Sequence, residues 1–383
     1  MPPDQKSLGA RLDWLDRMKG LAILGIVAFH FFQNYPERIP PIVLVDEQGA
    51  KLGYAGVDIF FVIVGFTTSY MLAKKIDLER FETAKIDWKS WLIKRLERIY
   101  PSYILAVILT LSLYYFFLPI QRFDPIKFTL SFLGLAAYRF QDINPGFWFF
   151  TVLLEAYLLI PIVFEIAGRK KRNILLLGIA IGVLTKIVCL FFLAPDQKSI
   201  YLYFLQNNFV GSYFFQVVLG LYWGLIYYKK GFFRRVDYKY SIGLFGIGLT
   251  IYIALTLHHI TPVYKLGFDM FFTPFLIILI HFLLIQADKI QKTKILSKSL
   301  FFLSLLGIYS YQIYLIHQPL YLVLLPNLTS FLTVNPYLKV FISFTIAMVL
   351  LTIYVIVFTR LEIIFKKFAF DPLLEKLRRR SNS

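Results

Sequence analysis

His30 lies inside the first apolar segment of the sequence, eleven residues after Lys19. On an α-helix this spacing corresponds to a rise of about 16 Å, so His30 would lie near mid-membrane if Lys19 lies at the interface. An imidazole titrates near neutral pH, and His30 could therefore take or give a proton as a general acid or base. The alternative interpretation is a buried histidine whose ring is satisfied by a neighbouring carbonyl.

Arg95 and Arg98 form a second candidate group, at the point where the chain enters its third long apolar segment. Residues three apart share one face of a helix. Two guanidinium groups on one face could bind phosphates with paired hydrogen bonds. Anchoring to lipid headgroups is the alternative, because basic residues often flank membrane helices.

Glu155 is a carboxylate near the middle of the fourth apolar segment, close to Trp148 and Tyr157. A charged side chain at membrane depth is costly unless it is paired, which makes it a functional candidate. Glu155 therefore needs a cationic or proton-sharing partner. A purely structural pair, for instance with Lys186, is the alternative.

His317 and Asp58 are ionisable residues in the ninth and second apolar segments, each toward the outer side. Either could act on a substrate from that side or make a hydrogen bond between packed helices. Lys186, Asp269 and His281 also lie at or near membrane depth, where packing or anchoring is the expected role. The sequence has no spacing typical of a metal site, so no metal is expected.

The composition indicates the elements that must position these residues. Of 383 residues 58% are hydrophobic and 17% are charged, and long apolar runs alternate with short basic clusters. A soluble domain carries about 25% charged residues, whereas a membrane helix needs about 20 consecutive apolar ones. The net charge of +18 does not indicate nucleic-acid binding, because the Lys and Arg residues flank apolar segments and would face lipid headgroups.

The sequence therefore predicts an all-α polytopic membrane protein with about ten transmembrane helices and both termini in the cytoplasm. With ten spans, every basic cluster falls on the same side of the membrane. The apolar stretch Phe128–Tyr138 is short and predicts a re-entrant or interfacial segment. We expect a transmembrane domain over residues 1–365 and a basic cytoplasmic tail over residues 366–383. The expected spans are Leu21–Phe32, Gly53–Ala73, Ile99–Leu118, Phe147–Ala167, Ile174–Ala194, Phe209–Tyr228, Ser241–Leu257, Phe268–Gln286, Leu300–Leu325 and Val340–Thr359.

Five segments in order resemble motifs of the acyltransferase family 3 membrane proteins. That family has an Arg or Lys, ten residues and then a His in its first helix, and it has an Arg-x-x-Arg element. Lys19 and His30 fit the first pattern, and Arg95 and Arg98 fit the second. The five matching segments are Leu15–His30, Gly56–Phe66, Arg95–Pro101, Trp148–Pro161 and Gly307–His317.

The resemblance implies transfer of an acyl group, usually acetyl, from cytoplasmic acyl-CoA to a hydroxyl of a cell-envelope carbohydrate or glycolipid. Lys19, Arg95 and Arg98 would bind the CoA phosphates. His30 would act as a general base or carry the acyl group transiently, and both routes stay open. The remaining candidates are Glu155 and His317 as catalytic groups and Asp58, Trp148 and Tyr157 as acceptor-binding groups.

Two other classes of protein share these features. A multi-span sugar or glycolipid transporter also has ionisable groups at the membrane midplane. A membrane sensor or scaffold would need no CoA at all. The resemblance implies a bacterial inner membrane. Some members carry an extra extracytoplasmic esterase-like domain, which we do not expect here because the sequence ends soon after the last expected span. The acceptor, the acyl chain and the oligomeric state stay open.

Overall fold

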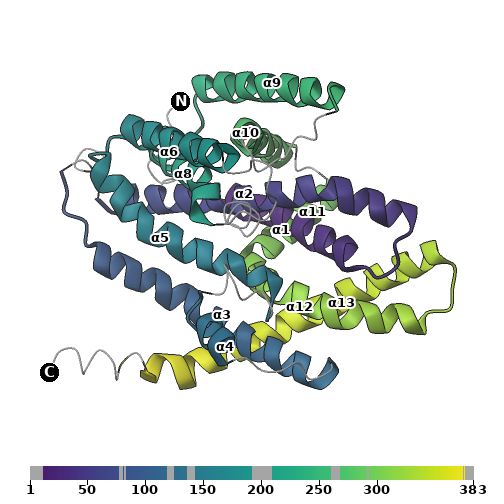
Figure 1. The fold of residues 1–383 in the computed structure, drawn as a ribbon. Helices are drawn as coiled ribbons and strands as arrows, with labels where there is room; N and C mark the ends of the chain where they lie inside the picture. Colours follow the sequence, from purple (N-terminus) through teal and green to yellow (C-terminus); the bar gives the residue numbers. More distant parts are fainter. Residues whose placement is uncertain are drawn as a thin grey trace. The chain divides into compact units, whose positions relative to one another are not determined.

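The computed structural model describes residues 12–76, 81, 83–118, 125–135, 143–191, 209–259, 268–290, 293–373 and 375 of the chain (Figure 1). Every regular element among these residues is a helix. A backbone that crosses lipid must satisfy its own polar groups, and a helix does so within one segment. The predicted all-α class is therefore confirmed for the described part of the chain.

The helices follow one another along the chain with short connections. Their bounds are α1 (Asp13–Asn34), α2 (Pro40–Ile76), α3 (Trp88–Phe117), α4 (Pro125–Phe132), η2 (Pro145–Phe147), α5 (Trp148–Ile166), α6 (Lys171–Phe191), α8 (Val210–Lys230), α9 (Arg235–Leu257), α10 (Phe268–Lys289), α11 (Lys294–Ile308), α12 (Ser310–Phe331), α13 (Pro336–Phe365) and η4 (Lys366–Phe370).

Seven helices in the described ranges are long and apolar enough to cross a membrane, and a bent pair, α11 with α12, could supply an eighth span. The chain is therefore an integral membrane protein. The first and fifth expected spans correspond to α1 and α6, which are helical but are not among these seven. The total of ten spans and the cytoplasmic placement of both termini thus stay predictions.

The expected ninth span, Leu300–Leu325, is interrupted in the structure. Helix α11 ends at Ile308 and α12 begins at Ser310. Tyr309 between them has φ −94° and ψ 9°, which lies outside the helical region of backbone conformations. The apolar run is continuous through this break, so hydropathy alone gives no sign of it.

The short segment predicted at Phe128–Tyr138 overlaps the second half of α4, an eight-residue helix that is too short to cross a membrane. Hydroxyl groups of neighbouring elements satisfy the backbone carbonyls at its end. Tyr103 Oη donates to the Ser131 carbonyl at 2.6 Å, and Thr151 Oγ1 donates to the Gly134 carbonyl at 2.5 Å. The last carbonyls of a helix need such partners where water is scarce. Residues 136–138 of the predicted segment lie outside the described residues.

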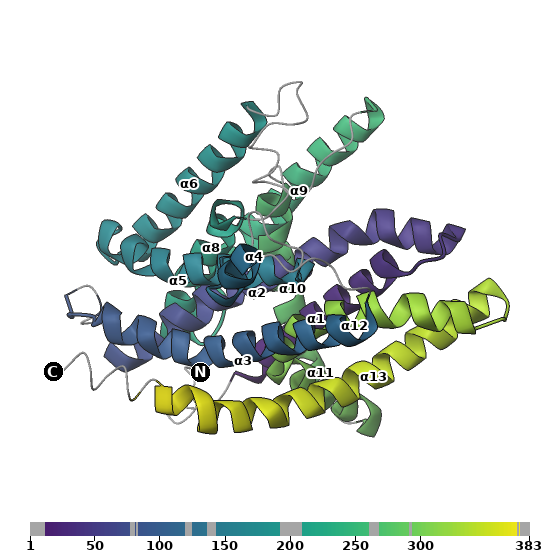
Figure 2. The ribbon, with the colours of Figure 1, turned by 60° about the horizontal axis from the view of Figure 1, so that its bottom comes forward.

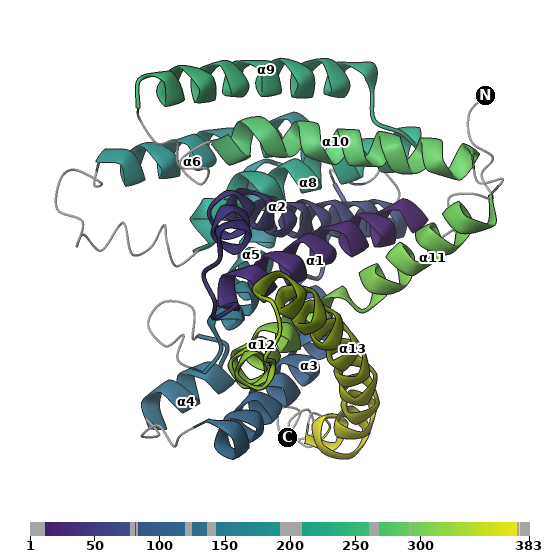
Figure 3. The ribbon, with the colours of Figure 1, turned by 90° about the vertical axis from the view of Figure 1, so that its right-hand side faces the viewer.

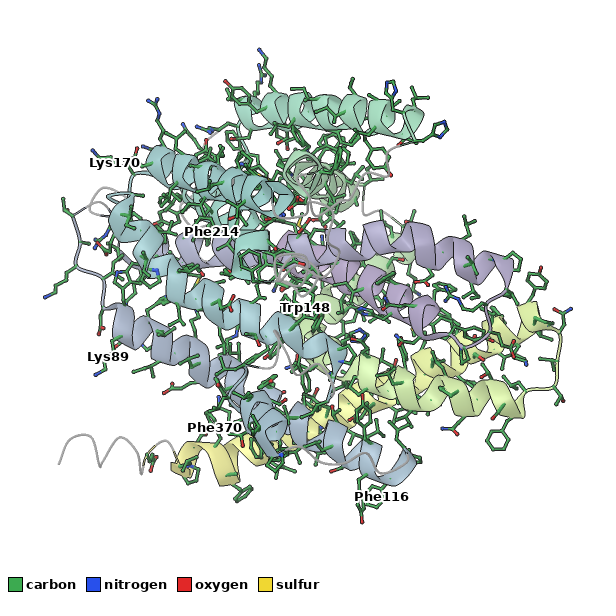
Figure 4. All side chains as sticks on the ribbon, viewed as in Figure 1. Lys89, Phe116, Trp148, Lys170, Phe214 and Phe370 are labelled. Carbon is green, nitrogen blue, oxygen red and sulfur yellow. The ribbon has the colours of Figure 1, made fainter. Side chains whose placement is uncertain are left out.

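The chain forms two compact units. Unit 1 comprises Met1–Ile26, Lys51–Ile86 and Val152–Ile308, and unit 2 comprises Val27–Ala50, Asp87–Thr151 and Tyr309–Ser383. In unit 1, α8 packs against α6, and α9 lies alongside α10 (Figure 3). In unit 2, α12 packs against both α13 and α3 (Figure 2). Lys89 and Phe116 mark the polar and apolar ends of α3 (Figure 4).

Glycines allow α2 and α8 to approach each other closely in unit 1. A Cβ atom at Gly65 of α2 would overlap the carbonyl oxygen of Val217 on α8. Reciprocally, a Cβ atom at Gly220 would overlap the carbonyl oxygen of Val62 on α2. Within lipid, hydrophobic burial gives little drive for helices to associate, so they depend on close packing. Small residues permit this packing because they let the two backbones approach each other.

We expect Gly65→Ala and Gly220→Ala each to lower the free energy of unfolding by about 1–3 kcal/mol, because the added methyl group overpacks the interface. Gly243→Ala on α9 is the matched control, because a Cβ atom there has no neighbour within 4 Å. Thermal unfolding of the purified protein in detergent measures the difference. Equal stability of all three variants would contradict the close approach of α2 and α8.

Candidate active site

A hydrogen bond joins two histidines that are 287 residues apart in the sequence. His30 Nδ1 on α1 lies 2.8 Å from His317 Nε2 on α12. His317 is fully buried and His30 is partly exposed. The two residues belong to unit 2, and their ring centroids are 5.0 Å apart.

A second contact assigns the protons of this pair. His317 Nδ1 lies 3.0 Å from the carbonyl oxygen of Ile313, which can only accept a hydrogen bond. His317 Nδ1 therefore carries the proton, and in a neutral ring its Nε2 is an acceptor. His30 Nδ1 must then donate to that nitrogen. This tautomer leaves a lone pair on His30 Nε2, which could take a proton from a hydroxyl or attack an acyl carbon.

The backbone around the histidine pair is held by side-chain amides. Asn34 Nδ2 donates to the carbonyl oxygen of His30 at 2.7 Å, in the last turn of α1. Asn144 accepts from the Gly146 backbone N–H at 2.8 Å and donates to the Leu315 carbonyl at 3.2 Å. The loop before α5 is thereby tied to α12 two residues before His317, which fixes the backbone beside the histidine pair.

The arginine pair also lies in unit 2, near the start of α3. Arg98 is exposed, and the half-buried Arg95 has its guanidinium carbon 5.5 Å from the centroid of the Trp91 ring. Directly after Arg98, the Ile99 carbonyl accepts a hydrogen bond from Tyr311 Oη at 3.1 Å. Tyr311 precedes His317 by six residues, a rise of about 9 Å along α12. The arginine pair is thus connected to the helix that carries His317.

Lys19 and Arg17 of α1 have carboxylate partners in unit 1. Lys19 Nζ lies 2.8 Å from Asp16 Oδ1, and Arg17 bonds to Asp288 and to Ser304. Helix α1 is continuous from Lys19 to His30, so their spacing along the helix is the expected one. The sequence did not predict the partner of Lys19, although an acidic residue three positions earlier on a helix is a common one.

A family model for an acyltransferase domain matches residues 12–360 of the chain. The chain belongs to this family. The match confirms the resemblance that the order of motifs indicated.

Among the acyltransferase's curated relatives is O-acetyltransferase OatA of Staphylococcus aureus (strain NCTC 8325 / PS 47), which is 24% identical over 334 residues. The alignment covers 81% of this chain and 50% of OatA, so the chain spans about half the length of this relative. Putative O-acetyltransferase SACOL0978 of S. aureus (strain COL) is 32% identical over 93 residues, which are 24% of this chain and 12% of that protein. No solved structure matches the chain.

The other predicted site residues of this acyltransferase lie in both units. Glu155 accepts the backbone N–H of Val210 at 2.9 Å, and Tyr157 is buried on the same helix, α5, in unit 1. Trp148 is half-buried at the start of α5 and belongs to unit 2 (Figure 4). Asp58 is 1% exposed in unit 1, where its two oxygens accept from Gln216 Nε2 at 3.2 Å and Thr273 Oγ1 at 2.9 Å.

Asp58 is part of a buried polar network that the sequence did not predict. Gln216 Nε2 also donates to Asp269 Oδ2 at 2.7 Å, and Lys186 Nζ lies 3.2 Å from the same oxygen. The alternative interpretation of Glu155 was a structural pair, for instance with Lys186, whereas the structure pairs Lys186 with Asp269. Lys186 and Asp269 were noted for their membrane depth, but Gln216 was not considered. Gln216 is an amide within the apolar run of α8, and this was the sequence signal for a polar contact between packed helices.

Proposed function

We propose that this protein is a membrane-embedded acyltransferase that moves an acyl group, most simply acetyl, from acyl-CoA to a hydroxyl of a cell-envelope carbohydrate or glycolipid. The observation that carries the proposal is the hydrogen-bonded pair of His30 and His317, with a lone pair on His30 Nε2. Family membership supports acyl transfer, and the names of the relatives support oxygen as the acceptor atom.

In the proposed reaction His30 is the general base. Its Nε2 takes the proton of the acceptor hydroxyl as the oxygen forms a bond to the acyl carbon, and the carbon–sulfur bond then breaks. The thiolate leaves with the electron pair and receives the proton from His30. While His30 is positively charged, its Nδ1–H bond to the neutral His317 becomes charge-assisted and stronger. His317 therefore both orients the base and stabilises its protonated form.

The donor is proposed to bind by its phosphates to Arg95 and Arg98. CoA carries several phosphates, and guanidinium groups bind phosphates with paired hydrogen bonds. Arg95 and Arg98 belong to the same unit as the histidine pair toward which the acyl group would extend. Lys19 is proposed to add a further cation, which requires its contact with Asp16 to be shared with the ligand.

The acceptor is proposed to bind on the outer side of the membrane. Trp148 is the candidate of choice for stacking on a sugar ring, because it is half-buried at the start of α5. Tyr157 and Glu155 are secondary candidates. The oxygens of Asp58 are engaged in helix packing, which favours a supporting role for that residue.

The proposed setting is a bacterial inner membrane with both termini in the cytoplasm. This orientation puts every basic cluster of the sequence on the cytoplasmic side, where acyl-CoA is found. The basic tail, residues 366–383, would then lie against anionic lipid headgroups. The domain boundary at residue 365 is part of the same proposal.

We expect His30→Ala to lower the rate of acyl transfer by about 10²–10⁴-fold, the usual contribution of a positioned general base. The assay follows transfer of radiolabelled acetyl from acetyl-CoA to envelope glycans by the purified protein in lipid nanodiscs. His258→Ala is the matched control, because His258 is exposed at the end of α9. An unchanged rate in His30→Ala would contradict the mechanism. If the unmodified protein moved glycans across the membrane without transferring an acyl group, it would instead be a transporter. An acyl group trapped on His30 would make it the acyl carrier.

We expect Arg98→Gln to weaken acetyl-CoA binding by about 10–100-fold, which corresponds to the loss of a hydrogen bond to a charged group. The effect should shrink as salt is raised, because salt screens the attraction between exposed charges. Equilibrium binding of acetyl-CoA at two salt concentrations measures it. Lys89→Gln, an exposed cation on the same helix, should change binding much less. Equal effects of the two variants would indicate that Arg98 anchors the protein to lipid headgroups and does not bind the CoA phosphates.

A further inference from the structure

Two tyrosines of α12 lie against the ring of His317. Tyr314 is three residues before His317 and Tyr321 is four residues after it, so all three share one face of the helix. Their ring centroids lie 5.7 Å and 5.9 Å from that of His317. Both tyrosines are buried, with exposed fractions of 2% and 0%.

The hydroxyl groups of Tyr314 and Tyr321 have no hydrogen-bond partner among the described residues. Leaving a buried hydrogen-bond donor unsatisfied is unfavourable. A phenylalanine would keep the ring at each position and would not carry the unsatisfied hydroxyl. Other tyrosines of unit 2 have partners at carbonyl groups. Tyr100 Oη donates to Leu133 at 2.7 Å, and Tyr311 Oη donates to Ile99 at 3.1 Å. Tyr35 and Tyr114 also lack a hydroxyl partner in the described part of the chain, but neither belongs to α12.

We propose that the hydroxyls of Tyr314 and Tyr321 bind the oxygen of the acyl carbonyl group and stabilise the negative charge that develops on it during transfer. The inference rests on the proposed function and adds two catalytic residues to it. Donors aimed at a developing oxyanion are often the largest single contribution to acyl-transfer catalysis. Such donors must be free of other partners before the substrate arrives, and this is the state of both hydroxyls.

The step has a simple balance of charges. As the acceptor oxygen attacks the acyl carbon, the π electrons of the carbonyl move onto its oxygen, and His30 holds the hydroxyl proton. The oxyanion accepts hydrogen bonds from the two phenol groups, which keep their protons. When the carbonyl re-forms, the electron pair of the carbon–sulfur bond leaves with the thiolate, which takes the proton from His30.

The test compares Tyr314→Phe and Tyr321→Phe with Tyr311→Phe. Each change removes one oxygen atom from α12 and leaves the ring in place. We expect each of the first two to lower kcat by about 10²-fold with KM for acetyl-CoA changed less than about two-fold, as for removal of one oxyanion donor. Their melting temperatures should stay the same or rise, because an unsatisfied buried donor is lost. Tyr311→Phe should show the reverse pattern, a lower melting temperature with unchanged kcat.

The outcomes separate this inference from the proposed function. If the unmodified protein transfers acetyl but Tyr314→Phe and Tyr321→Phe keep kcat within two-fold, the oxyanion role is overturned and the proposed function stands. If the unmodified protein transfers no acyl group, the proposed function itself fails. Replacing Tyr314 by 3-fluorotyrosine gives a second test that does not depend on the folding of the Phe variant. A stronger phenol donor should then change kcat without changing the melting temperature, and an unchanged kcat would overturn the role.

Discussion

The hydrogen bond between His30 and His317 is the contact on which the site depends, because it joins α1 to α12 and fixes the protons of both rings. His317 can play this part only because the Ile313 carbonyl occupies its other nitrogen. The result is a neutral base with one lone pair at a defined atom. Many enzymes that activate a hydroxyl use a similar arrangement of three groups, which are the hydroxyl, a base and a third group that orients the base.

Burial in an apolar environment gives this contact its importance. An unsatisfied polar group costs much more in such surroundings than in water, which favours specific partners for polar side chains within the helices. Lys186 and Gln216 both contact Asp269 in unit 1, and Tyr103 and Thr151 donate to carbonyls beside α4 in unit 2. The hydroxyls of Tyr314 and Tyr321 beside His317 lack such a partner among the described residues, and these are the groups that we propose for the acyl oxygen.

Much of the fold and part of the site followed from the sequence alone. The apolar runs predicted helices, and the order of motifs predicted the family, because both are properties of local sequence. His30 and His317 were each named as candidates, but their pairing was not, since it depends on how distant helices pack. The same limit explains why Lys186 was considered as a partner for Glu155 and not for Asp269. The break at Tyr309 was missed because hydropathy measures composition and carries no information on backbone angles.

The tautomer of His30 is the most direct test of this mechanism. Nuclear magnetic resonance of ¹⁵N-histidine in the nanodisc-embedded protein at neutral pH reports which ring nitrogen carries the proton, and a His30→Gln sample assigns the His30 signals. The geometry predicts a neutral His30 ring with its proton on Nδ1, hydrogen-bonded to an unprotonated His317 Nε2. A His30 ring with its proton on Nε2 would have no lone pair to offer a hydroxyl there, and that result would contradict its role as the base.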